Sequence, residues 1–147
     1  MPAGLLRRLG ALLYDTLLIV ASMMIATALF LPLTGGEAVT AETHPMLELV
    51  YQLVLLSLLV AFYGYFWTRG GQTLGMAAWR LRVEREDHGL LTWPDTLRRL
   101  AWATVSLLCA GAGLLWVAVD RERRAWHDRL SHTRVVVVPK RPRRPRP

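Results

Sequence analysis

The chain has 147 residues, of which 53% are hydrophobic, yet it carries a formal net charge of +7 at pH 7. Its length predicts one domain, but its charges stand in blocks between long apolar runs, which excludes an ordinary soluble domain. The single cysteine, Cys109, excludes an intramolecular disulfide, and we expect its thiol to pack among apolar neighbours.

Three apolar segments are long enough to cross a membrane, because a helix needs roughly 20 apolar residues to span about 30 Å of hydrocarbon. They are residues 9–33, interrupted only by Asp15, residues 46–68, with Glu48 near their start, and residues 100–119, which hold no charge. A secretory signal is the alternative for the first segment, but its uncharged run is longer than a signal core of about 7–15 residues. We therefore expect membrane helices.

The distribution of arginine predicts the orientation of these helices. Arg7 and Arg8 precede the first segment, the loop of residues 34–45 has acidic residues but no Lys or Arg, and the loop of residues 69–99 is rich in arginine. By the positive-inside rule, the N-terminus and the second of these loops are cytoplasmic, and the short acidic loop is outside.

The third segment is expected to break near its middle. The chain beyond residue 120 is also rich in arginine and should be cytoplasmic, which three full crossings would not allow. Gly111 and Gly113 are a natural place to break a helix, so we favour a re-entrant form with Trp102 and Trp116 both near the inner interface. A straight third span with its basic tail outside is the alternative. In either case a stripe of small residues suits close helix packing: Ala103, Ser106, Ala110 and Gly113.

Two short stretches predict a small β element. Residues 79–85 and 90–93, joined by a turn, have the pattern of a hairpin, and the β-branched residues 132–138 predict another strand. If that strand pairs with the hairpin, both lie on the same side of the membrane, which also favours a cytoplasmic C-terminus.

The last nine residues, 139–147, contain only Pro, Arg and Lys and predict a disordered tail. Their positive charge suits anionic lipid head groups. Nucleic acid is the weaker alternative for the tail, because no aromatic cluster or folded module accompanies it.

Asp15 is the strongest candidate for a functional residue, because an ionisable group inside the hydrocarbon costs roughly 2.5–3.5 kcal/mol. Arg8, Asp15 and Ser22 follow one another at seven-residue intervals and share nearly one helix face, which should look at protein or water. Arg8 is too far along the helix for a direct salt bridge, so a different cation neutralises Asp15 or it holds a proton. The alternative to an ion site is an aspartate paired with another arginine to assemble the helices.

The other polar candidates have plainer explanations. Glu48 and Gln52 form an i, i+4 pair at the outer end of the second helix, as at a solvated helix end. His127 and Asp128 could be an acid–base pair, but no nucleophile or metal partner accompanies them, which favours a loop or helix-cap role. The glycine-rich residues 69–75 lack the Gly-Lys-Ser/Thr ending of a phosphate loop and predict a turn under the helices. The sequence therefore predicts no enzyme, no cofactor and no metal site.

Four motifs together resemble the RDD family of small bacterial integral membrane proteins, which is named for one arginine and two aspartates. They are Arg-Leu-Gly-Ala-Leu-Leu-Tyr-Asp (8–15), Gly-Gln-Thr-Leu-Gly (71–75), Leu-Arg-Val (81–83) and Trp-His-Asp-Arg-Leu-Ser-His-Thr-Arg-Val (126–135). The resemblance implies an RDD-like membrane domain over residues 1–138, with Arg8, Asp15 and Asp128 as the name-giving residues. Met76 and Ala77 replace frequent basic residues of the family, which puts any anion or carboxylate contact there in question.

The expected fold class is an all-α membrane protein with two transmembrane helices, a third hydrophobic segment that is re-entrant or spanning, and a small cytoplasmic β element. The resemblance implies a multi-pass protein of the bacterial inner membrane, and some family members look like antiporters of Na⁺, Li⁺ or K⁺ and protons. We therefore expect transport of monovalent cations or protons, or assistance in it. Asp15 would bind the ion, Arg8 would set its pKa and orient the helix, and Asp128 would fix the cytoplasmic end.

The chain offers few helices to enclose a pathway, so a transporter of this size is expected to be a homo-oligomer or to join other membrane proteins. The alternative function is a non-transporting assembly or scaffold protein. It would use the same polar residues to hold helices together and the basic tail to bind lipids or a partner.

Overall fold

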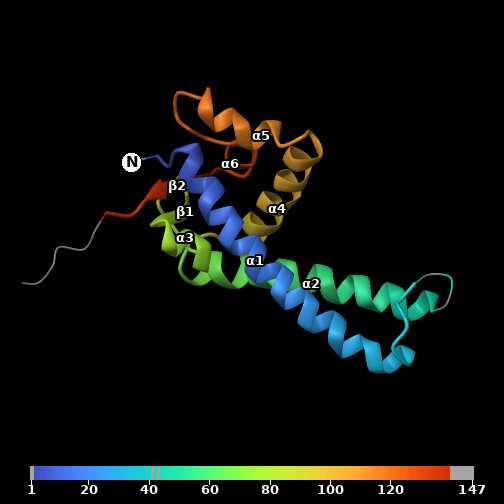
Figure 1. The fold of residues 1–147 in the computed structure, drawn as a ribbon. Coiled ribbons are helices and arrows are strands. Elements are labelled where there is room, and N and C mark those ends of the chain that lie inside the picture. Colours follow the sequence, from blue (N-terminus) through green and yellow to red (C-terminus); the bar gives the residue numbers. More distant parts are fainter. Residues whose placement is uncertain (1, 41, 43, 140–147) are drawn as a thin grey trace, which may run out of the picture.

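Two long helices form a hairpin that projects from the rest of the molecule (Figure 1). The computed structural model describes residues 2–40, 42 and 44–139. Helix α1 (Leu5–Phe30) continues into a 3-10 turn, η1 (Leu31–Thr34), and α2 (Pro45–Arg69) returns alongside it. Both helices are long and apolar enough to cross a membrane, and their apolar side chains are almost entirely exposed. Such a surface needs lipid or protein to cover it.

Helix α1 begins four residues earlier than the expected segment and takes in Arg7 and Arg8. Hydropathy alone predicts a helix that starts after Arg7 and Arg8, because charged residues do not count toward an apolar segment. Arg8 is buried inside the protein, where it has partners, so its charge does not end the helix.

The third apolar segment is broken, as its glycines predict. Helix α4 (Trp93–Leu108) ends at Cys109, and α5 (Ala112–Leu115) with the 3-10 turn η2 (Trp116–Ala118) leaves at 104° to it. Gly111 at the break has a left-handed backbone, with φ of 73°. The two arms satisfy the requirements for a span only when they are counted together.

Helix α4 starts seven residues before the expected segment. The hydroxyl of Thr92 accepts from the backbone N–H of Asp95, and the carboxylate of Asp95 accepts from the backbone N–H of Thr92, which is a complete capping box. Pro94 in the first turn suits the same helix start. This cap lies inside the arginine-rich loop, where a search for apolar runs does not find it.

The small residues of this segment pack within the chain. A Cβ atom added to Gly113 would lie 2.2 Å from Oγ of Ser106, so the glycine lets α5 fold against α4. The expected burial of Cys109 is wrong, because the break turns its side chain outward and leaves it exposed.

The β element is a two-stranded antiparallel sheet of β1 (Leu81–Arg85) and β2 (Thr133–Val137), paired from Leu81 with Val137 to Arg85 with Thr133. The predicted C-terminal strand is confirmed. The second arm of the predicted hairpin is wrong: residues 90–92 form no strand, because the cap at Thr92 starts α4 there.

A small core joins the sheet to the base of the helical hairpin. Its buried members come from segments that are far apart in the sequence: Ala3, Ala11, Trp67, Met76, Leu81, Val83, Leu91 and Val135. The short helices α3 (Leu74–Ala78) and α6 (Trp126–Leu130) cover it, with α3 against α1 and α6 against α4. Residues 140–147 of the predicted basic tail lie outside the described residues.

Helix α3 lies so close to α1 that Gly75 has no room for a side chain. A Cβ atom at this position would lie 2.3 Å from the carbonyl oxygen of Ala11 and 2.7 Å from Oδ1 of Asp15. The backbone atom cannot move aside as a side-chain tip can, so α3 must shift as a unit. The glycine therefore fixes the distance between the two helices.

We expect Gly75→Ala to lower the free energy of unfolding by about 1–3 kcal/mol, the usual cost of overpacking. Gly70→Ala is the matched control, because the nearest atom to its added Cβ lies 3.8 Å away. Thermal unfolding of the purified protein in detergent measures both variants. Equal melting temperatures for the two would contradict the close approach of α3 and α1.

Candidate functional site

A buried carboxylate between two arginines lies where the two ends of the chain meet. The side chain of Asp128 is fully buried, and its Oδ2 accepts a 2.5 Å hydrogen bond from Nη1 of Arg8. Nη1 of Arg99 lies 2.6 Å from the other oxygen, Oδ1. Residues of α1, α4 and α6 therefore share one buried charge cluster, which we call the Asp128 cluster.

The two arginines also bind the segments around them. Arg8 donates from Nε to the carbonyl of Ala3 and from Nη2 to the carbonyl of Arg123. Arg99 donates to the hydroxyl of Thr133 on β2, and its guanidinium lies 5.1 Å from the ring centroid of Trp67. The Asp128 cluster thus holds together the N-terminus, helices α1, α4 and α6, and strand β2.

Asp128 also starts α6, since its Oδ2 accepts from the backbone N–H of Ala125 at 3.0 Å. The sequence interpretation of this residue as a helix cap is therefore confirmed. Burial by itself would raise the pKa of the Asp128 carboxyl, but the charges of Arg99 and Arg8 hold it well below its usual range. Asp128 is a fixed anion and not a proton carrier near neutral pH.

His127 lies beside the same cluster. Burial, followed by the positive charge of Arg99, lowers the pKa of His127 to about 4, and its Nδ1 is buried without a hydrogen-bond partner. The ring is therefore neutral near pH 7. The alternative of an acid–base pair with Asp128 is not supported by this geometry, because neither group titrates near neutral pH.

Asp15 is held in a different way, by neutral groups. Its Oδ2 accepts a 2.5 Å hydrogen bond from the hydroxyl of Thr73, and its Oδ1 accepts a 2.9 Å bond from the backbone N–H of Gly75. The Thr73 hydroxyl in turn accepts from the N–H of Met76 and caps α3. The predicted turn over residues 69–75 is confirmed, and its function in the structure is to hold this carboxylate.

In the described part of the chain, Asp15 forms no ion pair. The expectation that another arginine pairs with Asp15 is therefore wrong, and Arg8 acts on Asp128 instead. The substitution of basic residues by Met76 and Ala77 does not remove the carboxylate contact, because a hydroxyl and a backbone N–H make it.

The Asp15 carboxylate lies at a cavity of about 290 Å³, which Arg8 and Arg99 of the Asp128 cluster also line. Asp15 and Arg8 line it from α1, Tyr63 and Trp67 from α2, and Arg99 from α4, and His127 is also part of its wall. The rest of the wall is mainly apolar: Ala11, Leu12, Leu59, Met76, Leu81, Leu100, Ala103, Thr104, Leu107, Leu114 and Val135. A mainly apolar cavity with a few convergent polar groups is the usual form of a binding site.

The remaining predicted residues lie away from this cavity. Ser22 donates to the carbonyl of Leu18 within α1. Gln52 donates to Glu48 at 2.8 Å on the exposed first turns of α2, as predicted for a solvated helix end. Within residues 2–40, 42 and 44–139, no group of three or more His, Cys, Asp or Glu could hold a metal ion.

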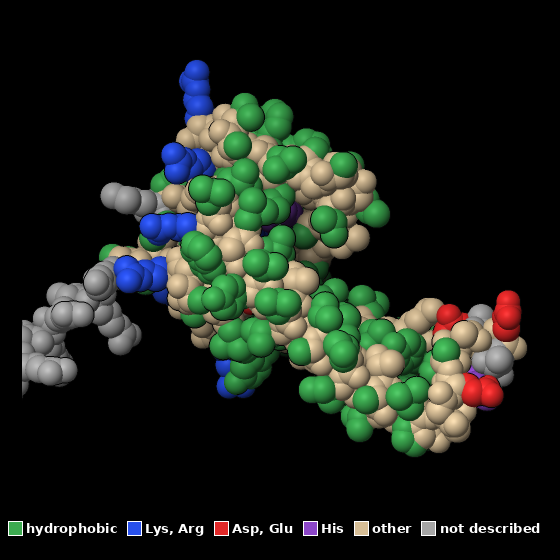
Figure 2. All heavy atoms as spheres, in the orientation of Figure 1, with side chains coloured by type: hydrophobic (Ala, Val, Ile, Leu, Met, Phe, Trp, Pro, Cys, Tyr) green, Lys and Arg blue, Asp and Glu red, His purple; other side chains and the backbone are tan. Residues whose placement is uncertain are grey.

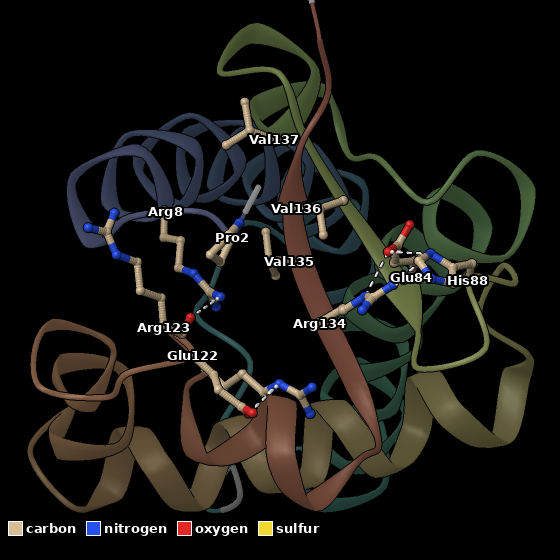
Figure 3. A pocket seen from close by; sticks show the side chains of 11 residues that line it. Pro2, Arg8, Glu84, His88, Glu122, Arg123, Arg134, Val135, Val136 and Val137 are labelled. Carbon is tan, nitrogen blue, oxygen red and sulfur yellow. Dashed lines mark hydrogen bonds and ion pairs between the residues drawn. The ribbon is translucent and has the colours of Figure 1, made fainter.

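A second hollow, of about 510 Å³, lies between β2, the N-terminus and the segment before α6 (Figure 3). Most of its charges are already paired within the chain. Nε of Arg134 lies 2.8 Å from Glu84, and Nε of Arg124 lies 3.2 Å from Glu122. The cavity at Asp15, where charged groups lie among apolar walls, is therefore the better candidate site.

Sequence reasoning missed half of this site. In the sequence, Arg99 is one arginine among several in a loop predicted to be cytoplasmic, and Thr73 and Gly75 belong to a predicted turn. Tyr63 and Trp67 read as part of an apolar helix. A usable signal was the need for a second cation beside Asp128, because a fully buried carboxylate requires compensation.

A family model described as the RDD family matches residues 2–132. No curated protein and no solved structure matches the chain. The matched range contains Arg8, Asp15, Arg99 and Asp128, so both buried carboxylates and both arginines fall within it.

We expect Asp128→Asn to lower the free energy of unfolding by about 3–5 kcal/mol, because it leaves two arginines buried without their counter-charge. Asp87→Asn is the control, since Asp87 forms an exposed pair with Arg85 and its Oδ1 accepts from the backbone N–H of Gly89, which an amide oxygen can also do; the substitution should cost about 0–1 kcal/mol. Chemical unfolding in detergent measures the difference. A similar small loss in both variants would show that the Asp128 cluster does not hold the fold.

His127 predicts a decline in stability with acid. The folded-state pKa of about 4 lies below the ordinary value of 6.5, so the unfolded chain binds the extra proton between these values and stability falls as pH decreases from 6.5 to 4. At about 1.36 kcal/mol per pH unit, the full loss is about 3 kcal/mol. His127→Phe should flatten this part of the stability curve, whereas His88→Asn, at an exposed ring, should not. An unchanged slope in His127→Phe would argue against a buried neutral ring.

Proposed function

The chain belongs to the RDD family of membrane-type proteins, and on this premise we propose that it moves, or helps to move, protons or monovalent cations through a site at Asp15. The proposal requires no catalysed reaction and no bound cofactor. The observation that carries it is a membrane-helix carboxylate that lines a cavity and has no cationic side chain as a partner in the described residues.

The groups around Asp15 suit a small cation or a proton. The carboxylate oxygens and the Thr73 hydroxyl are hard oxygen ligands of the kind that alkali cations accept. A proton could occupy the same carboxylate, because Thr73 can rotate its hydroxyl and accept a hydrogen bond where it now donates one. Either occupant would neutralise a charge that no arginine of the described chain pairs with.

Charge and tryptophan positions support a membrane placement with the sheet on the cytoplasmic side. Figure 2 shows acidic side chains at the far tip of the α1–α2 hairpin and arginines at the opposite end of the molecule. This polarity follows the positive-inside rule. Two half-exposed tryptophans lie against the helices of the hairpin, as in an interfacial belt: Trp79 at Gly10 of α1 and Trp93 at Gly64 of α2.

On this placement, the chain is a multi-pass protein of the bacterial inner membrane with both termini in the cytoplasm. The N-terminus and β2 lie side by side, since the N–H of Ala3 donates to the carbonyl of Val135, which supports a shared side for both ends. The basic tail would then meet anionic lipid head groups of the inner leaflet.

The Asp128 cluster would close the cytoplasmic end of the site. Arg8 orients α1 through Asp128, and Arg99 fixes α4 beside it. Two membrane helices and one bent segment are too few to surround an ion pathway. We therefore propose that the exposed faces of α1 and α2 contact a second copy or another membrane protein.

An assembly or scaffold protein is the second candidate, and the Asp128 cluster favours it. A buried carboxylate with two arginines specifies how helices meet without any need for transport. The two functions differ at Asp15: an ion site loses flux alone on neutralisation, whereas an assembly residue loses flux and association together.

We expect Asp15→Asn to abolish ion-dependent proton movement in proteoliposomes, because an amide neither binds a proton near neutral pH nor carries the charge that attracts a cation. The assay follows lumenal pH after addition of Na⁺, Li⁺ or K⁺ to vesicles with equal amounts of protein. Glu48→Gln is the matched control, since it also neutralises a membrane-helix carboxylate, but at an exposed helix end.

Loss of flux in Asp15→Asn with wild-type flux in Glu48→Gln would support the site. Folded wild-type protein that moves no proton with any of these ions would contradict transport and favour the assembly function. Equal loss in both variants would show that Asp15 is not the specific site.

A further inference from the structure

One edge of the Arg99 guanidinium has no hydrogen-bond partner among the described residues. Its Nη1 contacts both Asp128 and the Thr133 hydroxyl, whereas its Nε is buried without a hydrogen-bond partner, and no partner of Nη2 occurs among the described residues. The Nε–Nη2 edge of a guanidinium is one that binds a carboxylate through two parallel hydrogen bonds. Only 4% of Arg99 is exposed, so this edge is kept from bulk water.

The plane of this arginine is already fixed. Asp128 holds one end of the guanidinium, and the Trp67 ring lies 5.1 Å from its central carbon. An anion that bound here would need little reordering of the side chain, which favours affinity.

Two neighbours carry further unsatisfied nitrogens. Nε1 of Trp67 and Nδ1 of His127 are buried without partners, and both side chains line the cavity of about 290 Å³ together with Arg99. Buried donors without partners are rare in native proteins and call for an explanation. Arg99, Trp67 and His127 all line the same cavity.

The rest of the wall and the charge count define the ligand class. Leu12, Leu59, Leu107 and Leu114 offer an apolar surface, and the volume is near the lower limit of small-molecule pockets. At the Asp128 cluster, two arginines face one carboxylate, so the cluster has one excess positive charge. Asp15 accepts hydrogen bonds from Thr73 and Gly75 and forms no ion pair with Arg99 among the described residues, so it does not occupy the Nε–Nη2 edge.

We infer that this cavity binds a small monocarboxylate with an apolar body, whose carboxylate pairs with the Nε–Nη2 edge of Arg99 and whose chain lies among the leucines. The indole N–H of Trp67 donates a further hydrogen bond to the bound acid. The inference concerns binding and does not rest on ion movement. It gives the cavity a ligand besides the proton or cation proposed at Asp15.

Equilibrium dialysis with labelled hexanoate tests this inference on the full chain in lipid nanodiscs, with protein-free nanodiscs as the blank for partition into lipid. Hexanol and hexylammonium have the same apolar body with a neutral or a positive head. We expect saturable binding of hexanoate only. Equal binding of hexanol, or a preference for hexylammonium, would overturn the assignment of Arg99 as an anion site.

Three substitutions locate the ligand. Arg99→Lys keeps a positive charge beside Asp128 but loses the two-pronged edge, and Ala103→Leu fills the cavity wall without touching a charge; each should weaken hexanoate binding at least about tenfold. Trp67→Phe removes one N–H and should weaken it about threefold. Wild-type affinity in Ala103→Leu, shown to be folded by its thermal transition, would overturn the site even if Arg99→Lys fails to fold.

Asp15→Asn separates this inference from the proposed function. The substitution removes a negative charge from the same cavity, so hexanoate should bind it at least as tightly as it binds the wild type. Hexanoate binding by wild-type protein that moves no proton with any of the ions tested would reject only the transport proposal. Loss of hexanoate binding in folded Asp15→Asn protein would reject the anion site at Arg99.

Discussion

The burial of one carboxylate, Asp128, is the constraint on which the fold depends. A charge without exposure to water must be paired and hydrogen-bonded, or its desolvation would cost several kcal/mol. Arg8 and Arg99 meet that need, and each can reach Asp128 only if α1, α4 and α6 converge at one point. The further bonds of these arginines, to Ala3 and to Thr133, bring the N-terminus and β2 to the same place. The cluster therefore joins the elements alongside the small apolar core, in a molecule whose large apolar side chains are mostly exposed.

Asp15 is also a buried carboxylate, but its desolvation is compensated by neutral groups and not by arginines. It is satisfied by a hydroxyl and a backbone N–H from the short turn before and within α3, and neither group carries charge. The contact needs the close approach that Gly75 allows, so the glycine and the aspartate depend on each other. One carboxylate is thus held by two arginines, and the other has no cationic partner among the described residues. This difference between the two aspartates is the physical basis for assigning a structural role to the first and for proposing ion binding at the second.

The cavity at Asp15 combines a few charged and polar side chains, Arg99 among them, with mainly apolar walls. Arg99 belongs to both environments, since one side of its guanidinium completes the Asp128 cluster and the other has no partner. Trp67 beneath it keeps the guanidinium in plane, and its own indole nitrogen also lacks a partner. The arrangement explains why so small a protein keeps so many buried polar groups near one point. They hold the helices together and, on our inference, also offer a site for a charged ligand.

The sequence by itself determined the local features of this protein. Hydropathy located α1 and α2, the glycines located the break after α4, β-branched residues located β2, and the cost of buried charge singled out Asp15. Each of these signals lies within one helix, turn or strand, so it can be detected without knowing which elements pack together. Only the tertiary structure decided the partners: Arg8 with Asp128 across 120 positions, Arg99 beside them, and Thr73 with Asp15 across 58. It also paired β1 with β2 and not with residues 90–93, since contacts between distant segments depend on how whole elements pack.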